Sequence, residues 1–213
     1  MDHPAAQNPV RQWAFYFDSS LCSGCKACQG ACKDKNDLEV GVLWRRVYEV
    51  QGGGWKKSGS LWLPSILTYH LSMSCHHCEN PICAPSCPTK AIFKRQDGIV
   101  FIDTSACIGC RYCEWACPYG AIQFDDYTHL ATKCDFCWDL LEQGRPPACV
   151  AACPMRALDF GDLENLHKKY PGTSDVFPLP DTKETRPAVI IKPHRDAAKA
   201  SADTAEVANW EEI

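Results

Sequence analysis

The chain has 213 residues, of which 46% are hydrophobic, with a formal net charge of −4 and 16 cysteines. Lysine and arginine are scattered along the sequence and form no basic stripe, which excludes nucleic acid as a partner. The length allows one or two domains, and the many cysteines indicate that bound metal replaces much of an ordinary hydrophobic core.

The amino-terminal stretch "MDHPAAQNPVRQWAFYFD" lacks the apolar run of a signal peptide. No later segment offers the roughly 18 uninterrupted apolar residues that a membrane-spanning helix needs. We therefore expect the chain to be soluble by itself and to carry no export signal of its own.

The first cysteine group lies in "LCSGCKACQGACK", residues 21–33, within a predicted cluster-binding segment 1–35. Disulfides would use these thiols poorly, because neighbours this close form tiny loops that constrain little of the unfolded chain. The group consists of Cys22, Cys25, Cys28 and Cys32.

Residues 36–74 are predicted to form a β-rich insertion. The strand-like pieces "LWRRVYEV" and "SILTYHLSM" are separated by the glycine-rich "QGGGWKKSGS". Arg45 and Arg46 form a twin arginine inside the first piece, with no apolar region after it. We expect both to be surface residues of a strand and not a targeting signal.

A central dicluster ferredoxin module is predicted over residues 75–133. Residues 91–103, "AIFKRQDGIVFID", read as a β-hairpin that joins its two cysteine groups. His76 and His77 are expected to tune a neighbouring cluster by hydrogen bonding or to lie at its surface; the alternative is a ligand or proton-relay role. The two groups are Cys75, Cys78, Cys83 and Cys87, then Cys107, Cys110, Cys113 and Cys117.

A fourth cluster-binding segment, residues 134–160, is predicted to pair with the first. Residues 161–213 are predicted to form a short helix, "LENLHKKYPG", and an extended partner-binding tail. We expect the proline-rich 177–195 to run as a strap over the surface, and the acidic end from about Ala197 to be loose unless a partner orders it. The fourth group is Cys134, Cys137, Cys149 and Cys153.

The four groups form an internal repeat that ends in CxxxC. Three of them continue as "CPTKAI", "CPYGAI" and "CPMRAL", whereas Lys33 follows the last cysteine of the first group. The run CxxCxxCxxxCP is typical of [4Fe–4S] ferredoxins, in which the fourth cysteine binds another cluster. Zinc sites usually join two separated cysteine pairs and need no third thiolate between them. The sequence therefore predicts four [4Fe–4S] clusters, linked in pairs.

The predicted fold class is α+β. We expect two ferredoxin-like dicluster [4Fe–4S] modules with short helices and β-hairpins, a β-rich insertion and an extended carboxyl-terminal tail.

The sequence resembles the iron–sulfur (B) subunits of anaerobic dimethyl sulfoxide reductases, within the four-cluster ferredoxin-like subunits of molybdopterin oxidoreductases. The resemblance covers most of its length. In nitrate reductases the comparable subunit has tryptophan in place of one cysteine of the third group, a substitution that this sequence lacks. The matching stretches are "FYFDSSLCSGCKACQGACKD", "SCHHCENPIC", "CIGCRYCEWACPYGA", "TKCDFCWD", "CPMRALDFG" and "TRPAVIIKPH".

The resemblance implies a non-catalytic electron-transfer subunit. Its partners would be an integral membrane anchor that oxidises quinol and a large molybdopterin-containing catalytic subunit. The complex would lie peripherally on the cell membrane, either on the cytoplasmic side or exported together with a signal-bearing partner. The alternatives are a subunit of a related molybdenum or tungsten enzyme, such as polysulfide or thiosulfate reductase or formate dehydrogenase, or a free polyferredoxin.

The resemblance also implies how the ligands are shared: the first group exchanges its last cysteine with the fourth, and the second with the third. The first cluster would lie nearest the catalytic subunit and the last nearest the membrane. Arg111, Tyr112 and Trp115 lie in the presumed membrane-side loop, where Arg111 is expected to raise the potential of that cluster. The implied sets are Cys22, Cys25, Cys28 and Cys153; Cys134, Cys137, Cys149 and Cys32; Cys75, Cys78, Cys83 and Cys117; and Cys107, Cys110, Cys113 and Cys87.

Overall fold

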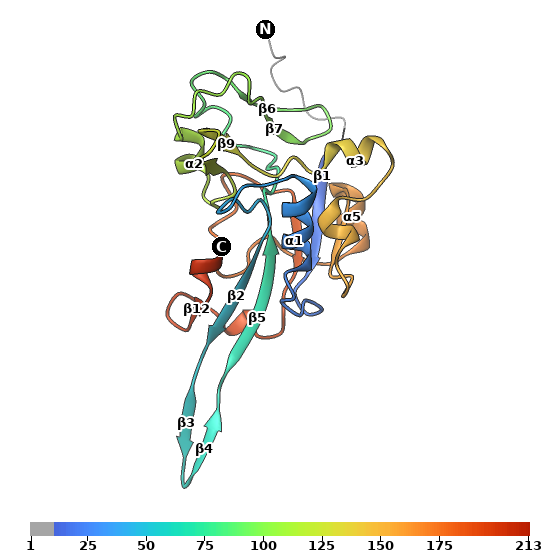
Figure 1. Cartoon of the computed structure of the whole chain (residues 1–213). Coiled ribbons are helices and arrows are strands. Elements are labelled where there is room, and N and C mark those ends of the chain that lie inside the picture. Colours follow the sequence, from blue (N-terminus) through green and yellow to red (C-terminus); the bar gives the residue numbers. More distant parts are fainter. Residues whose placement is uncertain (1–10) are drawn as a thin grey trace.

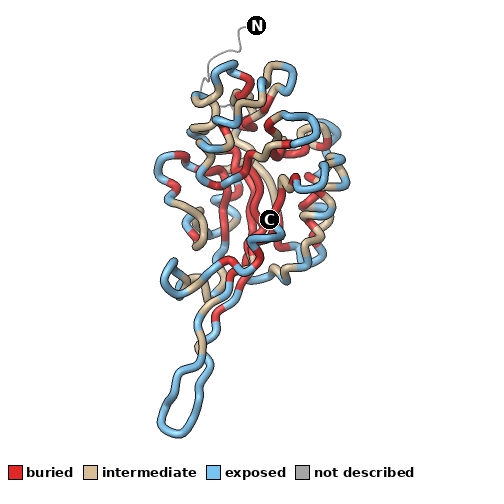
Figure 2. Tube along the Cα trace, turned by 60° about the vertical axis from the view of Figure 1, so that its left-hand side comes forward, coloured by how far each residue is buried: buried red, intermediate tan, exposed pale blue. Residues whose placement is uncertain are grey.

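The computed structural model describes residues 11–213. Residues 1–10 lie outside the described residues. They belong to the predicted segment 1–35 and to the amino-terminal stretch in which no signal peptide was predicted. Figure 1 shows a rounded body from which a long β arm projects. The buried backbone runs through the middle of the body, whereas the end of the arm is exposed (Figure 2).

A three-stranded sheet forms one side of the body, with β1 at its centre. Side chains alternate across β1: Phe15 and Phe17 enter the main core, and Ala14 and Tyr16 enter a smaller core on the other face. Both faces of this strand are therefore buried. The strands are β1 (Trp13–Asp18), antiparallel β10 (Leu158–Asp162) and parallel β11 (Val189–Lys192).

The expectation that residues 177–195 form only a surface strap is wrong for β11. Ile190 and Ile191 are completely buried, and they pair in register with Tyr16 and Phe17 of β1. The apolar run "AVII" is thus a core strand, since one face packs on each of the two cores. The helix predicted after residue 162 is confirmed as α5 (Leu163–Lys169), and the Asp162 side chain accepts a hydrogen bond from the Asn165 amide at its start.

The predicted β-rich insertion contains the strands of a second sheet, in the order β12-β2-β5. Beyond β2 and β5 the polypeptide continues as the arm, a hairpin that includes part of the glycine-rich stretch predicted to separate the strands. The tail predicted to be loose supplies β12, which pairs with β2, so it is ordered without a partner. The elements are β2 (Arg46–Gly52), β3 (Trp55–Ser58), β4 (Leu61–Pro64), β5 (Leu67–Met73), β12 (Ala205–Val207) and the 3₁₀ turns Ala197–Lys199 and Trp210–Glu212.

Short hairpins and short helices make up the rest of the body. The hairpin predicted at 91–103 is confirmed as β6 (Ile92–Lys94) and β7 (Val100–Ile102), and a similar hairpin joins the third cysteine group to the fourth. Mixed α and β structure was predicted and is confirmed. The remaining elements are α1 (Ala27–Lys35), α2 (Tyr112–Ala116), β8 (Gln123–Asp125), β9 (Leu130–Thr132), α3 (Trp138–Glu142) and α4 (Ala148–Ala151).

Within residues 11–213, none of the helices has both the length and the apolar character needed to cross a membrane.

Candidate iron–sulfur cluster sites

Three cavities are each lined by three cysteines from one group and the last cysteine of another group. We call these cysteine sets I, III and IV. The space between the atoms there, including space open to solvent, is about 310, 300 and 320 Å³. Set I is Cys22, Cys25, Cys28 and Cys153; set III is Cys75, Cys78, Cys83 and Cys117; set IV is Cys107, Cys110, Cys113 and Cys87.

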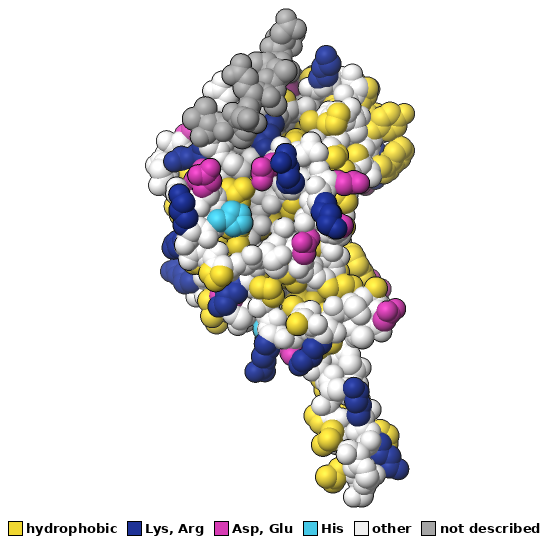
Figure 3. Space-filling model, turned by 180° about the vertical axis from the view of Figure 1, so that it is seen from behind, with side chains coloured by type: hydrophobic (Ala, Val, Ile, Leu, Met, Phe, Trp, Pro, Cys, Tyr) yellow, Lys and Arg dark blue, Asp and Glu magenta, His cyan; other side chains and the backbone are white. Residues whose placement is uncertain are grey.

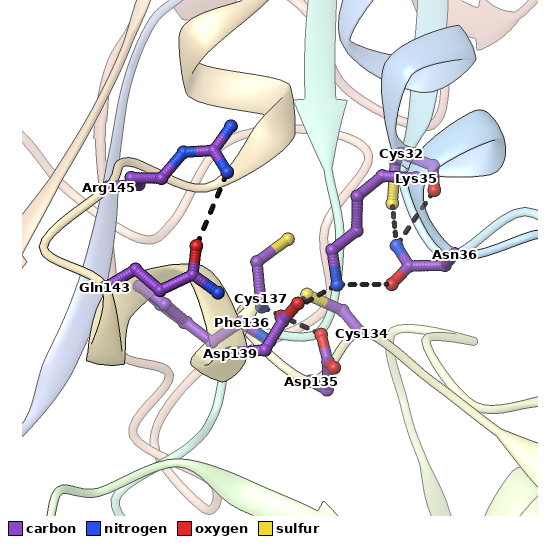
Figure 4. A network of polar contacts seen from close by, with 10 residues as sticks. All are labelled: Cys32, Lys35, Asn36, Cys134, Asp135, Phe136, Cys137, Asp139, Gln143 and Arg145. Carbon is purple, nitrogen blue, oxygen red and sulfur yellow. Dashed lines mark hydrogen bonds and ion pairs between the residues drawn. The ribbon is translucent and has the colours of Figure 1, made fainter.

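The remaining cysteines also come together, and we call them set II: Cys134, Cys137, Cys149 and Cys32. In Figure 4 the side chains of Cys32, Cys134 and Cys137 gather in one region, although Cys32 comes from α1 and the other two precede α3. The charge of Cys149 raises the pKa of Cys32, after a larger effect of burial. A Lys35–Asp139 ion pair of 2.7 Å ties α1 to α3 beside this set.

The four sets follow one another through the molecule. The charge of Cys149 in set II raises the pKa of Cys28 in set I, and the charge of Cys75 in set III raises the pKa of Cys134 in set II. These pairs of sets are therefore neighbours. Sets III and IV share helix α2: Cys113 of set IV lies within it, and Cys117 of set III follows its end one turn later. The resulting order is I, II, III, IV.

The CxxC turn of every group has a residue with positive φ at the same place. The residue before the second cysteine has a positive φ, and in two groups its N–H points back at the first sulfur: Gly109 N lies 3.4 Å from Cys107 Sγ, and Phe136 N lies 3.4 Å from Cys134 Sγ. A Cβ at Gly109 would clash with the carbonyl oxygen of His129, which explains the glycine there. The four residues are Gly24, His77, Gly109 and Phe136, with φ of 69, 43, 68 and 64°.

The repeated "CPxxA" sequence closes a second turn around the last sulfur of three groups. The N–H groups of Ala121 and Ala157 lie 3.4 and 3.3 Å from the sulfurs of Cys117 and Cys153. The residue before the alanine reverses the backbone with a positive φ, and the aliphatic residue after it is buried at or just before a strand. The turning residues are Lys90, Gly120 and Arg156, with φ of 57, 57 and 52°.

Burial makes several of these thiols weaker acids. It raises the pKa of Cys22 and Cys137 to about 11, and that of Cys32 and Cys78 to about 12. These four thiols are therefore protonated at neutral pH when no metal is bound. Metal ions bind the thiolate form, so metal binding at these sites must release protons.

The two histidines between Cys75 and Cys78 are both buried. His77 Nδ1 accepts a hydrogen bond of 3.1 Å from the Val100 amide. His76 lines the cavity of set III and packs on Tyr119, with 4.3 Å between ring centroids. Burial lowers the pKa of His76 to about 3, followed by the charges of Arg45 and Arg46, so this ring is neutral at physiological pH.

The twin arginines are not surface residues. Arg45, just before β2, is 2% exposed, and Arg46, the first residue of β2, is 9% exposed. Lys133 is also buried; it lines the cavity of set III and donates a hydrogen bond of 3.0 Å to the Cys134 carbonyl. Sequence reasoning missed these cations, since scattered basic residues in apolar stretches carry no pattern that marks them as buried.

The residues present fit [4Fe–4S] clusters. Each of the three cavities is lined by thiols, apolar side chains and a lysine or arginine, and backbone N–H groups are directed at the sulfurs as cluster ligands require. Within residues 11–213, Arg45 Nε, His77 Nε2 and both ring nitrogens of His76 are buried without a hydrogen-bond partner. The same part of the sequence has no three His, Cys, Asp or Glu side chains grouped closely enough to hold a single metal ion.

A family model described as a 4Fe-4S dicluster domain matches residues 66–163. The sequence is 46% identical over 202 residues to the B subunit of anaerobic dimethyl sulfoxide reductase from Escherichia coli strain K12, covering 95% of this protein and 98% of the relative. It is 45% identical over 196 residues to the B subunit of the same name in Haemophilus influenzae, covering 92% and 95%. It is 38% identical over 190 residues to the B subunit of polysulfide reductase from Wolinella succinogenes, covering 87% and 96%.

These relatives match along nearly their whole length, and the 16 cysteines of this protein fit four [4Fe–4S] clusters. The protein therefore belongs to the family of anaerobic dimethyl sulfoxide reductase B subunits, the non-catalytic iron–sulfur electron-transfer subunits of reductase complexes.

Proposed function

We propose that this protein relays electrons from a quinol-oxidising membrane anchor subunit to a molybdopterin catalytic subunit of the dimethyl sulfoxide reductase type. When bound, the clusters supply one-electron redox chemistry, and the residues of this protein hold them in order. The observation that carries the proposal is the gathering of all 16 cysteines into four consecutive sets across the molecule.

In this proposal each set ligates one cluster through its four cysteines. Sets I and II make one ferredoxin-like module from segments 1–35 and 134–160, and sets III and IV make the other from residues 75–133. The insertion 36–74 and the tail 161–213 bind partners. Support comes from the contact of α1 with α4, which joins the first and fourth segments, and from the hairpin β6–β7 within the central module.

Set IV is proposed to lie nearest the membrane anchor, and set I nearest the catalytic subunit. Ile108 and Trp115, which flank set IV, are 67 and 73% exposed. Figure 3 shows hydrophobic side chains projecting from the end of the body that holds α2. Exposed apolar side chains grouped in this way are more typical of a protein interface than of the surface of a free polyferredoxin.

Purification of the natural complex tests this function. We expect the protein to copurify with a molybdopterin subunit and a membrane subunit, and to carry about 16 iron and 16 sulfide per molecule, against about four zinc for a zinc-held module. Quinol should reduce the clusters, and dimethyl sulfoxide should reoxidise them. A subunit that purifies alone, with full iron but no response to quinol, would indicate a polyferredoxin; reoxidation by polysulfide alone would indicate a polysulfide reductase subunit.

Replacement of Arg111 should change the potential at set IV only slightly. The side chain lines the cavity of this set, but it is exposed and forms a two-point ion pair with Glu114, at 2.7 and 3.1 Å, that offsets its charge. We expect Arg111→Gln to lower the potential by less than about 59 mV, a tenfold change in a one-electron equilibrium, and Glu114→Gln to raise it. Redox titration followed by electron paramagnetic resonance measures both.

Quinol-linked turnover of Arg111→Gln should fall with the potential, whereas turnover with a small artificial donor to the catalytic subunit should stay near normal. A fall in both assays would instead indicate damage to folding or docking. An unchanged potential in both charge variants would mean that this surface pair does not act on set IV.

A further inference from the structure

Arg45 is a buried cation that has no role in the cluster ligation proposed above. It directly precedes β2 and is 2% exposed. Its guanidinium lies over the ring of Phe15, 4.7 Å from the centroid, on the side of the main core. Burial of a charged group is costly unless other groups compensate, so this position requires compensating partners.

Two serines of the strand region next to β2 hold the guanidinium. Nη1 donates to the carbonyl oxygen of Ser72 at 3.0 Å and to its hydroxyl at 3.2 Å, and Nη2 donates to the hydroxyl of Ser74 at 3.0 Å. Ser72 is in β5, which pairs with β2, and Ser74 follows it. These contacts fix the position of the guanidinium in the body.

The hydroxyl of Ser72 also contacts a cysteine of set I: its Oγ lies 3.2 Å from Cys28 Sγ. Arginine can only donate hydrogen bonds, so the Ser72 oxygen is the acceptor toward Arg45. The hydroxyl proton is then free to point at Cys28, and a thiolate at that position can only accept it. Arg45 therefore donates to Ser72, and Ser72 donates to Cys28.

Arg45 also interacts with cysteines, which are negatively charged when they ligate as thiolates. Cys149, Cys28, Cys134 and Cys32 each raise the pKa of the guanidinium, against the effect of its burial. In return, the charge of Arg45 lowers the pKa of Cys28 and Cys32, although burial raises both overall. Of these four cysteines only Cys28 belongs to set I, and Ser72 links it to the guanidinium through two contacts of 3.2 Å.

We propose that Arg45 is a positioning residue whose buried positive charge holds the reduction potential of the cluster at set I high, and that Ser72 carries part of this effect by hydrogen bonding to Cys28. Reduction adds one negative charge to a cluster. A fixed cation in a dry environment favours the reduced state, as does a hydrogen bond donated to a ligand sulfur. The proposal rests on the proposed ligation by set I.

Replacement of Arg45 tests the charge. In the cluster-loaded subunit within its complex, we expect Arg45→Met to lower the equilibrium constant for reduction at set I at least tenfold, a shift of about 59 mV for a one-electron couple. Arg45→Lys, which keeps the charge, should retain most of the original potentials. Redox titration followed by electron paramagnetic resonance measures these shifts, with the set I signal identified as the one altered by Cys22→Ser.

Arg46→Met is the matched control for loss of a buried arginine. Arg46 donates to the carbonyl oxygens of Tyr119 and Gly120, near set III, and its guanidinium is bonded to neither serine. The potential of set I should therefore change much less in this variant than in Arg45→Met.

Ser72→Ala and Ser74→Ala separate the sulfur contact from the support of Arg45. Both substitutions remove a hydroxyl that accepts from the guanidinium, but only Ser72 also contacts a cysteine sulfur. We expect Ser72→Ala to lower the potential of set I and Ser74→Ala to leave it near that of the unmodified protein. If Arg45→Met fails to assemble its clusters, the comparison of Ser72→Ala with Ser74→Ala still tests the proposal.

Equal shifts in the two serine variants would overturn the role of Ser72. Fully assembled clusters with unchanged potentials in Arg45→Met would overturn the role of Arg45, as would a potential in Arg45→Lys as low as that in Arg45→Met. Absence of a cluster signal from set I in the unmodified protein would instead contradict the proposed ligation itself.

Discussion

Without a supply of iron and sulfide, the protein is expected to be largely unfolded or aggregated. Eight cysteines, among them Cys28, Cys134 and Cys153, are buried, and several belong to the same core as Phe17 and Leu71. An empty site leaves a thiol-lined cavity in that core, which costs free energy or forces collapse. Structural zinc contributes about 10–16 kcal/mol in small domains, against a net stability of about 5–15 kcal/mol for typical proteins, so loss of four metal sites should exceed what packing provides.

Circular dichroism and chemical denaturation of protein expressed under iron limitation measure this outcome. The iron-replete protein is the control, and refolding with iron and sulfide should restore its spectrum. Cooperative, native-like unfolding of a cluster-free sample would contradict the prediction, because it would show that the sheets β10-β1-β11 and β12-β2-β5 suffice for the fold.

Replacement of Cys153 by serine should disturb the cluster of set I, although Cys153 is close in sequence to the cysteines of set II. Its sulfur lines the same cavity as Cys22, Cys25 and Cys28. Loss of one ligand should alter or abolish one cluster and remove up to about a quarter of the iron. Electron paramagnetic resonance of the reduced protein and iron analysis measure both effects.

Cys149→Ser is the matched control, because Cys149 lies one turn earlier in the same segment but belongs to set II. Cys153→Ser should change the signal that Cys22→Ser changes, whereas Cys149→Ser should change the signal that Cys134→Ser changes. If Cys153→Ser and Cys134→Ser affect the same signal, the fourth ligand is local and the proposed exchange between the first and fourth groups is wrong.

Local sequence was enough to predict the parts of this protein that depend on short-range geometry. The cysteine spacing predicts cluster binding, because a tight turn must present several sulfurs to one cluster. The hairpin 91–103 and the helix after Asp162 were also predictable, since a turn signal and a capping residue mark them within a few neighbouring residues. The positive φ at Phe136 was not predictable, because a bulky aromatic residue does not favour it and packing imposes it.

Tertiary structure decided where the distant segments go. The sequence of 177–195 is rich in proline and polar residues, yet its short apolar run becomes a core strand because β1 offers it a parallel partner from the other end of the polypeptide. Arg45 stands next to Arg46 in a strand-like stretch, and only its contacts with Ser72 of β5 and Phe15 of β1 determine that it is buried near Cys28. Burial and ligand sharing depend on contacts between residues far apart in sequence, and a local pattern cannot specify which distant surfaces meet.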